Sequence, residues 1–172
     1  MPPIPDPLVG TNLDNILDGD EFANNIEALA GSDQVRSFGG ADNVSLGDDN
    51  DADVLSGDDD DFDGDTVTDF GNEDTLTFLS LHMDISRDLS HASTTESTVF
   101  TLVPEQPMGE GPSITFTLTG DYTEGAFFGT HDGFGGWDVR FLAALPNLIE
   151  DTRLGNDEIN GIPNQEILVG DG

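Results

Sequence analysis

A short pattern recurs along the first half of the chain, in which an Asp or Asn is followed two positions later by an aliphatic residue. The aliphatic residues are 10, 9, 9, 11, 12 and 9 residues apart. These steps are too long for a heptad and too short for a helical-hairpin repeat. A unit of about nine residues with one inward side chain suits a very short strand followed by a turn, as in a parallel β-solenoid. The pairs are Asp14/Ile16, Asn24/Ile26, Asp33/Val35, Asp42/Val44, Asp53/Leu55, Asp65/Val67 and Asp74/Leu76.

The charge balance narrows the choice of partners. The 172 residues contain 36 acidic residues against four Lys and Arg, for a formal charge of -32. Such a chain lacks the basic surface that nucleic acid or an anionic membrane requires, and its natural small partner is a cation. No apolar stretch is long enough to span a membrane, and the N-terminus lacks the features of a signal peptide. We therefore expect no nucleic-acid binding, no membrane insertion and no cleaved signal.

The repeat resembles the RTX (repeats-in-toxin, hemolysin-type) family, whose nonapeptide is Gly-Gly-x-Gly-x-Asp-x-U-x, with U an aliphatic residue. The resemblance covers residues 10–78 and returns weakly in 154–172. It implies a calcium-binding parallel β-roll in a protein exported by type I secretion from a Gram-negative bacterium. The matching segments are GTNLDNIL (10–17), NNIEALAGSDQV (24–35), GGADNV (39–44), DADVLSG (51–57) and DGDTV (63–67).

The turns depart from the family pattern. Two positions before each Asp or Asn the family has a Gly with positive φ, and Asn and Asp tolerate that conformation better than other residues. Phe22 does not fit, so we expect an irregular coil over 18–26. The longer steps predict enlarged loops at 45–52 and 56–64, and hence a degenerate roll. The residues at the turn position are Asn12, Phe22, Gly31, Gly40, Asp51, Asp63 and Asn72.

Stacking of the repeats predicts the metal site. In the family two repeats complete one coil, so equivalent loops lie roughly 4.8 Å apart. Asp14, Asp33, Asp53 and Asp74 then line one edge, and Asn24, Asp42 and Asp65 line the other. Calcium takes six to eight oxygen ligands, so paired carboxylates and turn carbonyls suit it better than magnesium. We expect several calcium ions, at most about five, and these candidate ligands: Asp14, Asn24, Gly31, Asp33, Gly40, Asp42, Asp51, Asp53, Asp63, Asp65 and Asp74.

Two other interpretations of the acidic residues stay open. Residues 59–64 read Asp-x-Asp-x-Asp-Gly, the opening of an EF-hand loop, but the twelfth position is Phe70 instead of the bidentate Glu. The acid excess alone could also reflect adaptation to high salt. That adaptation gives no reason for a pattern every nine residues, whereas metal binding does.

The segment DTVTDFGNEDTLTFLS (65–80) resembles the part that closes the β-roll in serralysin-type proteases and in alginate epimerase repeat modules. Strand-like runs at 97–103, 113–120, 124–130 and 137–145 predict a small antiparallel cap. THDGFGGWD (130–138) reads as a hairpin loop. The cap's core is expected to hold Phe78, Phe100, Phe116, Phe128, Trp137 and Phe141. A sharper alternative is a solvent-facing, sugar-binding set of Tyr122, Phe127, Phe134 and Trp137.

The sequence offers no catalytic motif. His82, His91 and His131 lack the His-Glu-x-x-His spacing, and there is no Gly-x-Ser-x-Gly. We therefore expect no catalytic residues and no other cofactor in an all-β chain: repeats at 1–78, cap at 79–152, and a further repeat or returning strand at 153–172. The expected function is a non-catalytic, calcium-binding module of a secreted protein. The alternatives are an accessory module of a larger polysaccharide epimerase, lyase or metalloprotease, and a glycan-binding adhesion module.

Overall fold

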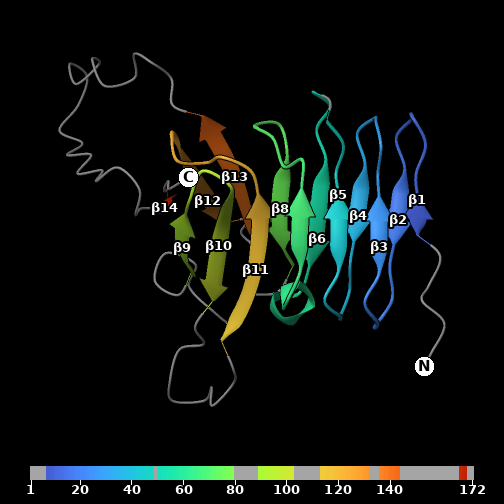
Figure 1. The fold of residues 1–172 in the computed structure, drawn as a ribbon, viewed down its shortest axis with the longest axis horizontal. Coiled ribbons are helices and arrows are strands. Elements are labelled where there is room, and N and C mark those ends of the chain that lie inside the picture. The colour runs from blue at the N-terminus through green and yellow to red at the C-terminus, as the bar shows by residue number, and fades with distance from the viewer. Residues whose placement is uncertain are drawn as a thin grey trace.

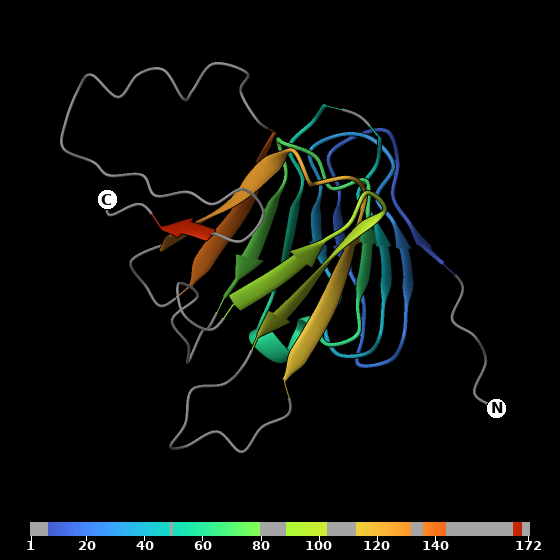
Figure 2. The same ribbon diagram turned by 60° about the vertical axis from the view of Figure 1, so that its left-hand side comes forward.

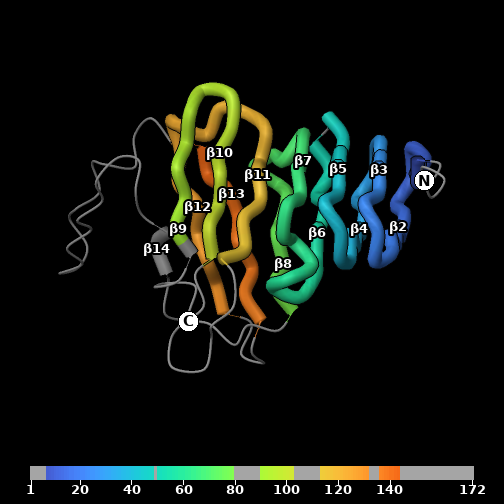
Figure 3. Tube along the Cα trace, turned by 60° about the horizontal axis from the view of Figure 1, so that its bottom comes forward, coloured from blue at the N-terminus to red at the C-terminus, as the bar shows by residue number. Residues whose placement is uncertain are grey.

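The structure, a computed structural model, describes residues 7–48, 50–79, 89–102, 113–131, 136–143 and 167–169. Within them the chain forms two seven-stranded sheets and one short 3₁₀ helix, η1 (Asp59–Phe62). Along residues 8–78 the chain alternates between the two sheets, so each coil adds one strand to both (Figures 1 and 3). The predicted all-β parallel roll is confirmed.

Eight short strands form the roll, and within each sheet they pair in parallel. The first sheet contains β1 (Leu8–Val9), β3 (Asn25–Glu27), β5 (Asn43–Ser45) and β7 (Thr66–Thr68). The second sheet contains β2 (Ile16–Asp18), β4 (Gln34–Arg36), β6 (Val54–Gly57) and β8 (Thr75–Phe78).

The register places one aliphatic residue of each roll strand from β2 to β8 in the interior, in two columns. In the second sheet the pairing aligns Leu17, Val35, Leu55 and Leu76, and in the first it aligns Ile26, Val44 and Val67. All seven are buried, while most of their strand neighbours are exposed or half-buried. The inward position of Val35, Val44, Leu55 and Val67 follows from the predicted spacing and is confirmed.

The first coil corrects the predicted register by one residue. Leu17 pairs with Val35 and is buried, whereas Ile16 is 68% exposed. Asn15, not Asp14, therefore occupies the repeat position that Asp33 holds in the next coil. With Leu17 in place of Ile16, the first three steps of the repeat are all nine residues long. This even spacing explains why Leu17, and not Ile16, faces the interior. The predicted irregularity at 18–26 is wrong as well, since β2 and β3 are regular on either side of Phe22.

The remaining strands continue the same two sheets beyond the roll (Figure 2). In the first sheet, β11 (Ile114–Thr119) pairs in parallel with β7, and β10 (Ser97–Leu102) and β9 (Leu89–Ser93) follow as antiparallel neighbours. In the second, β13 (Trp137–Ala143) pairs antiparallel with β8, then come β12 (Gly125–His131) and the parallel β14 (Ile167–Val169). The roll and the antiparallel strands thus share one interior.

Aromatic residues fill the junction between the two parts. Phe62 of η1 is fully buried, with ring centroids 4.8 Å from Phe78 and 5.6 Å from Phe116. The expected core of the antiparallel part is confirmed except at one position: Phe127 points inward and Phe128 is only half-buried. The two residues are adjacent on β12, so they face opposite sides of the sheet.

No helix in the described segments is both long and apolar enough to cross a membrane.

Candidate metal-binding edges

The turns of the roll form two edges, which we name after one aspartate in each. The Asp42 edge consists of turns 19–24, 37–42 and 58–65, and the Asp53 edge of turns 10–15, 28–33, 46–53 and 69–74. Turns 58–65 and 46–53 have eight residues and the others six, so the predicted enlarged loops are present in the third coil. In 58–65 the extra length forms η1.

The last residue of each turn forms a ladder with its equivalents in the neighbouring coils. On the Asp53 edge, Oδ1 of Asp33 accepts the amide of Asn15 at 2.6 Å, and Oδ1 of Asp53 accepts the amide of Asp33 at 2.7 Å. The amide of Asp53 donates in turn to Asp74 at 3.0 Å. One carboxylate oxygen of each aspartate therefore holds the backbone of the coil before it.

The Asp42 edge repeats this arrangement. Oδ1 of Asp42 accepts the amide of Asn24 at 2.6 Å, and Oδ1 of Asp65 accepts the amide of Asp42 at 2.8 Å. The five ladder aspartates are at most 4% exposed: Asp33, Asp42, Asp53, Asp65 and Asp74. Charged acceptors of this kind contribute about 1.5–3 kcal/mol each.

The second carboxylate oxygens on the Asp42 edge take no part in this ladder of hydrogen bonds. Oδ2 of Asp42 and Oδ2 of Asp65 are buried and accept no hydrogen bond. A buried carboxylate oxygen without a partner is costly unless a cation or a proton neutralises it. The donor chemistry therefore fits a hard cation such as calcium, which takes carboxylate, hydroxyl and carbonyl oxygens.

The electrostatics of the metal-free edge lead to the same conclusion. Burial raises the pKa of the Asp65 carboxyl to about 7, with a further increase from the nearby charge of Asp42. Burial also raises the pKa of Asp42, and the charges of Asp20 and Asp61 act in the same direction. Without a cation, this edge gains from holding a proton at neutral pH.

The other predicted ligands have different positions. Asn24 is half-buried at its ladder position, whereas Asp14, Asp51 and Asp63 are exposed. Asp14 lies one residue before the ladder and accepts the amide of Ser32 at 3.1 Å. Asp63 accepts the amide of Thr115 at 3.0 Å and so holds β11 against the turn.

Gly31 and Gly40 have φ angles of 109° and 132°, as the family pattern predicts. A Cβ at either position would lie within 3 Å of the backbone of the previous coil. Asn12, Phe22, Asp51, Asp63 and Asn72 do not have positive φ. Within the roll, the left-handed residues that the sequence did not indicate are Leu29, Phe38, Gly47, Gly64 and Asp69.

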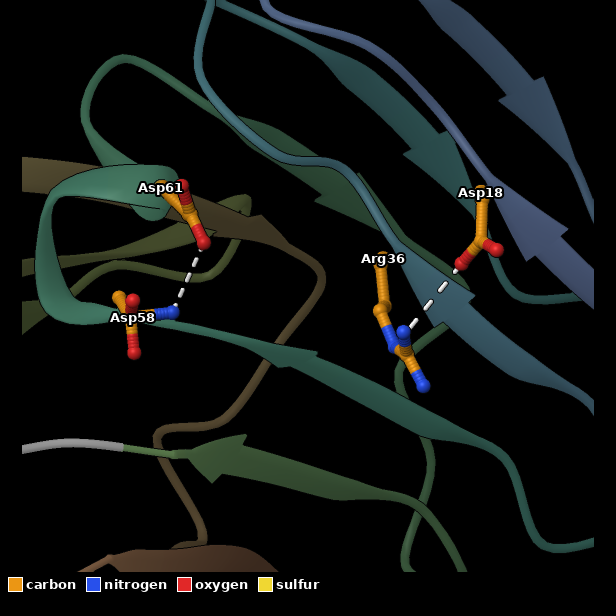
Figure 4. A network of polar contacts seen from close by, with 4 residues as sticks. All are labelled: Asp18, Arg36, Asp58 and Asp61. Carbon is orange, nitrogen blue, oxygen red and sulfur yellow. Dashed lines mark hydrogen bonds and ion pairs between the residues drawn. The ribbon is translucent and has the colours of Figure 1, made fainter.

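Arg36 is the one basic side chain of the described roll coils. Its Nε lies 3.8 Å from Oδ1 of Asp18 on the outer face of the second sheet (Figure 4). Both side chains are about half exposed, so this pair adds little stability. Arg36 therefore does not compensate the charge of the acidic edges.

In the described part of the chain, no three His, Asp or Glu side chains converge closely enough to hold a metal by themselves. A cation at either edge would need hydroxyl or backbone oxygens as well. The sequence did not single out Ser37, whose hydroxyl is also buried and free of hydrogen bonds. Its position in the repeat, where Gly19 and Gly57 stand in the adjacent coils, is the signal that could have revealed it.

The candidate sugar-binding aromatics belong to the interior. Tyr122, Phe127 and Trp137 are 7%, 1% and 9% exposed, and Phe134 lies outside the described residues. The Tyr122 hydroxyl donates to the carbonyl of Phe70 at 2.8 Å. These three residues do not form a solvent-facing aromatic platform.

His91 and His131, the two histidines within the described residues, show no catalytic grouping. His91 packs against Phe100 and Phe127, and the burial lowers its pKa. His131 lies beside Trp137, and His82 is outside the described residues. The EF-hand alternative fails because strands β6 and β7 flank 58–65, where an EF-hand has helices.

Two solved structures are similar to this chain. The AlgE6R2 subunit of the Azotobacter vinelandii mannuronan C5-epimerase is 21% identical, covering 67% of this chain and 85% of that one, with a TM-score of 0.42. The AlgE6R3 subunit of the same epimerase is 22% identical, covering 67% and 76%, with a TM-score of 0.29. No protein-family profile and no curated protein matches the sequence. The β-roll assignment accordingly depends on the strand registers of this chain itself.

Proposed function

We propose that this chain is a non-catalytic, calcium-binding β-roll module of an exported protein, stabilised by calcium at its turn edges. The observation that carries the proposal is the pair of buried oxygens, Oδ2 of Asp42 and Oδ2 of Asp65, which accept no hydrogen bond. Their carboxylates are already fixed through Oδ1, so the unused oxygens are held in place before a cation arrives.

In this proposal the turn residues of the two edges hold the coils together and bind calcium. The ladder aspartates join successive coils, and Gly31 and Gly40 allow those coils to approach closely. The aliphatic interior is thin, with one side chain per strand, and the coils carry many negative charges. Bound calcium would supply the neutralising charge, and its binding free energy would add to the free energy of folding.

Calorimetric calcium titration of the whole chain, with far-UV circular dichroism recorded alongside, tests the proposal. We expect saturable binding of a few ions and a higher unfolding temperature. Magnesium, and sodium at matched ionic strength, should reproduce neither effect. If sodium stabilised the chain as much as calcium does, the acidic residues would act through general screening, as in adaptation to high salt.

Export by type I secretion and membership of a larger secreted enzyme belong to the same proposal. They are supported by the resemblance of the repeats to the RTX pattern and by the strongly acidic composition. Expression of the chain in a bacterium with and without a type I exporter, followed by measurement of the protein in the medium, tests export.

A further inference from the structure

The Asp42 edge holds a group of buried polar side chains. Three buried polar atoms of this edge make no hydrogen bond: Oδ2 of Asp42, Oδ2 of Asp65 and Oγ of Ser37. The three residues are at most 1% exposed. The inference drawn from them rests on the proposed calcium function and specifies where the tightest site lies.

Ser37 carries a side chain at a repeat position that is glycine in the adjacent coils. The pairing of β2, β4 and β6 aligns it with Gly19 and Gly57, which have no side chain. Its hydroxyl lies beside the Asp65 carboxylate. The hydroxyl therefore adds one oxygen donor to this edge that the neighbouring coils cannot supply.

Asp61 brings a third negative charge to the same place. The buried ring of Phe62 anchors η1 in the interior, and Oδ2 of Asp61 accepts the amide of Asp58 at 2.8 Å (Figure 4). The side chain also packs on the end of β6, since a Cβ at Gly57 would lie 2.9 Å from the Asp61 Cβ. Its charge acts on both Asp42 and Asp65.

The Asp53 edge uses its oxygens differently. Asp74 already binds backbone amides through both oxygens, from Asp53 at 3.0 Å and from Gly71 at 2.7 Å. A cation at Asp74 would have to compete with a hydrogen bond that is already formed. Calcium affinity rises with the charge and the rigidity of the site, and the Asp42 edge combines two carboxylates fixed through Oδ1 with the nearby charge of Asp61.

We propose that the Ser37 hydroxyl is a calcium ligand together with Asp42 and Asp65, and that Asp61 strengthens this site as a fixed nearby charge. The resulting site has the highest calcium affinity in the roll. Two features distinguish it from the other turns of the roll. Ser37 stands where the adjacent coils have glycine, and the turn 58–65 is lengthened by η1.

Calcium titration of the whole chain by calorimetry tests the assignment with matched variants. Ser37→Ala and Ser37→Gly remove the hydroxyl, and the glycine variant restores the residue found in the adjacent coils. Ser32→Ala, in an exposed turn of the Asp53 edge, is the control. Asp61→Asn is compared with Asp60→Asn, which removes the same charge from an exposed position in η1.

We expect both Ser37 variants to weaken the tightest site by about tenfold, the range seen when a supporting group of a metal site is lost. Asp61→Asn should weaken it several-fold, and both controls should match the parent. Equal affinities for Ser37→Gly and Ser32→Ala, with the parent still binding calcium, would overturn the assignment and leave the proposed function standing. A parent chain that binds no calcium would instead overturn the proposed function.

Discussion

The amide of Asp33 donates a 2.7 Å hydrogen bond to Oδ1 of Asp53, a residue 20 positions later in the chain. Both residues are 1% exposed. The contact shows that a ladder aspartate has two separable properties, because its Oδ1 holds the preceding coil while its carboxylate also carries a negative charge. Mutations at the ladder can therefore separate structure from charge.

Asp53→Ala should destabilise the chain in chelator by about 1–3 kcal/mol, because it leaves the buried amide of Asp33 without its acceptor. Asp53→Asn keeps an oxygen acceptor and should cost less. Urea unfolding followed by circular dichroism measures both. Glu124→Gln, at an exposed position, is the control for lost charge. Equal losses for the alanine and asparagine variants would contradict the separation of these two properties.

The metal-free roll should become less stable as pH rises from about 4 to about 7. Burial raises the pKa of Asp65 from 3.8 to about 7, so between these values the folded state binds more protons than the unfolded state. Stability present at the lower pH is therefore lost as Asp65 ionises. Urea midpoints in chelator at pH 5, 6, 7 and 8 measure the trend.

Asp65→Asn should flatten that pH dependence, whereas Glu124→Gln removes an equal charge and should leave it unchanged. Saturating calcium should also oppose the trend, because a cation requires the deprotonated carboxylate. A pH dependence that is the same in Asp65→Asn as in the parent would show that general charge repulsion is its cause.

Phe62→Ala should destabilise the whole molecule by about 3–5 kcal/mol. The Phe62 ring is fully buried against Phe78 of the roll and Phe116 of the antiparallel part. Because the two parts share this interior, amide exchange should accelerate in both β8 and β11. Phe128→Ala, at a half-buried ring, is the control. Faster exchange confined to one part would mean that the two unfold independently.

The sequence predicted the interior of the roll from β3 onward, because an aliphatic residue that recurs after nine to twelve positions leaves little choice of register. It did not predict how the antiparallel strands attach. Their alternation shows that they are strands, but it does not show that β11 pairs with β7 and β13 with β8. The register of β12 was ambiguous for a similar reason, since Phe127 and Phe128 are adjacent and equally apolar.

The candidate site was only partly predictable. The ladder aspartates follow from the repeat, whereas the roles of Ser37 and Asp61 depend on which coil stacks on which. The first coil shows the same limit, because Asp14/Ile16 and Asn15/Leu17 both satisfy the pattern and only the pairing of Leu17 with Val35 decides between them.

Phe38→Gly should be more stable than Phe22→Gly by about 1 kcal/mol. Phe38 has a φ of 59°, and this left-handed conformation costs a residue with a Cβ roughly 1–2 kcal/mol. Glycine relieves that cost, although it adds roughly 0.5–1 kcal/mol of backbone entropy loss on folding. Phe22 has no positive φ, so its replacement brings the entropy loss alone.

The two rings are suited to this comparison because both lie on turns of the Asp42 edge and both are exposed, Phe38 by 38% and Phe22 by 64%. Thermal unfolding of the two variants beside the parent, in calcium and in chelator, measures the difference. Phe38→Gly should match or exceed the parent, and Phe22→Gly should fall below it. If the two variants lost the same stability, the left-handed conformation of Phe38 would carry no measurable strain.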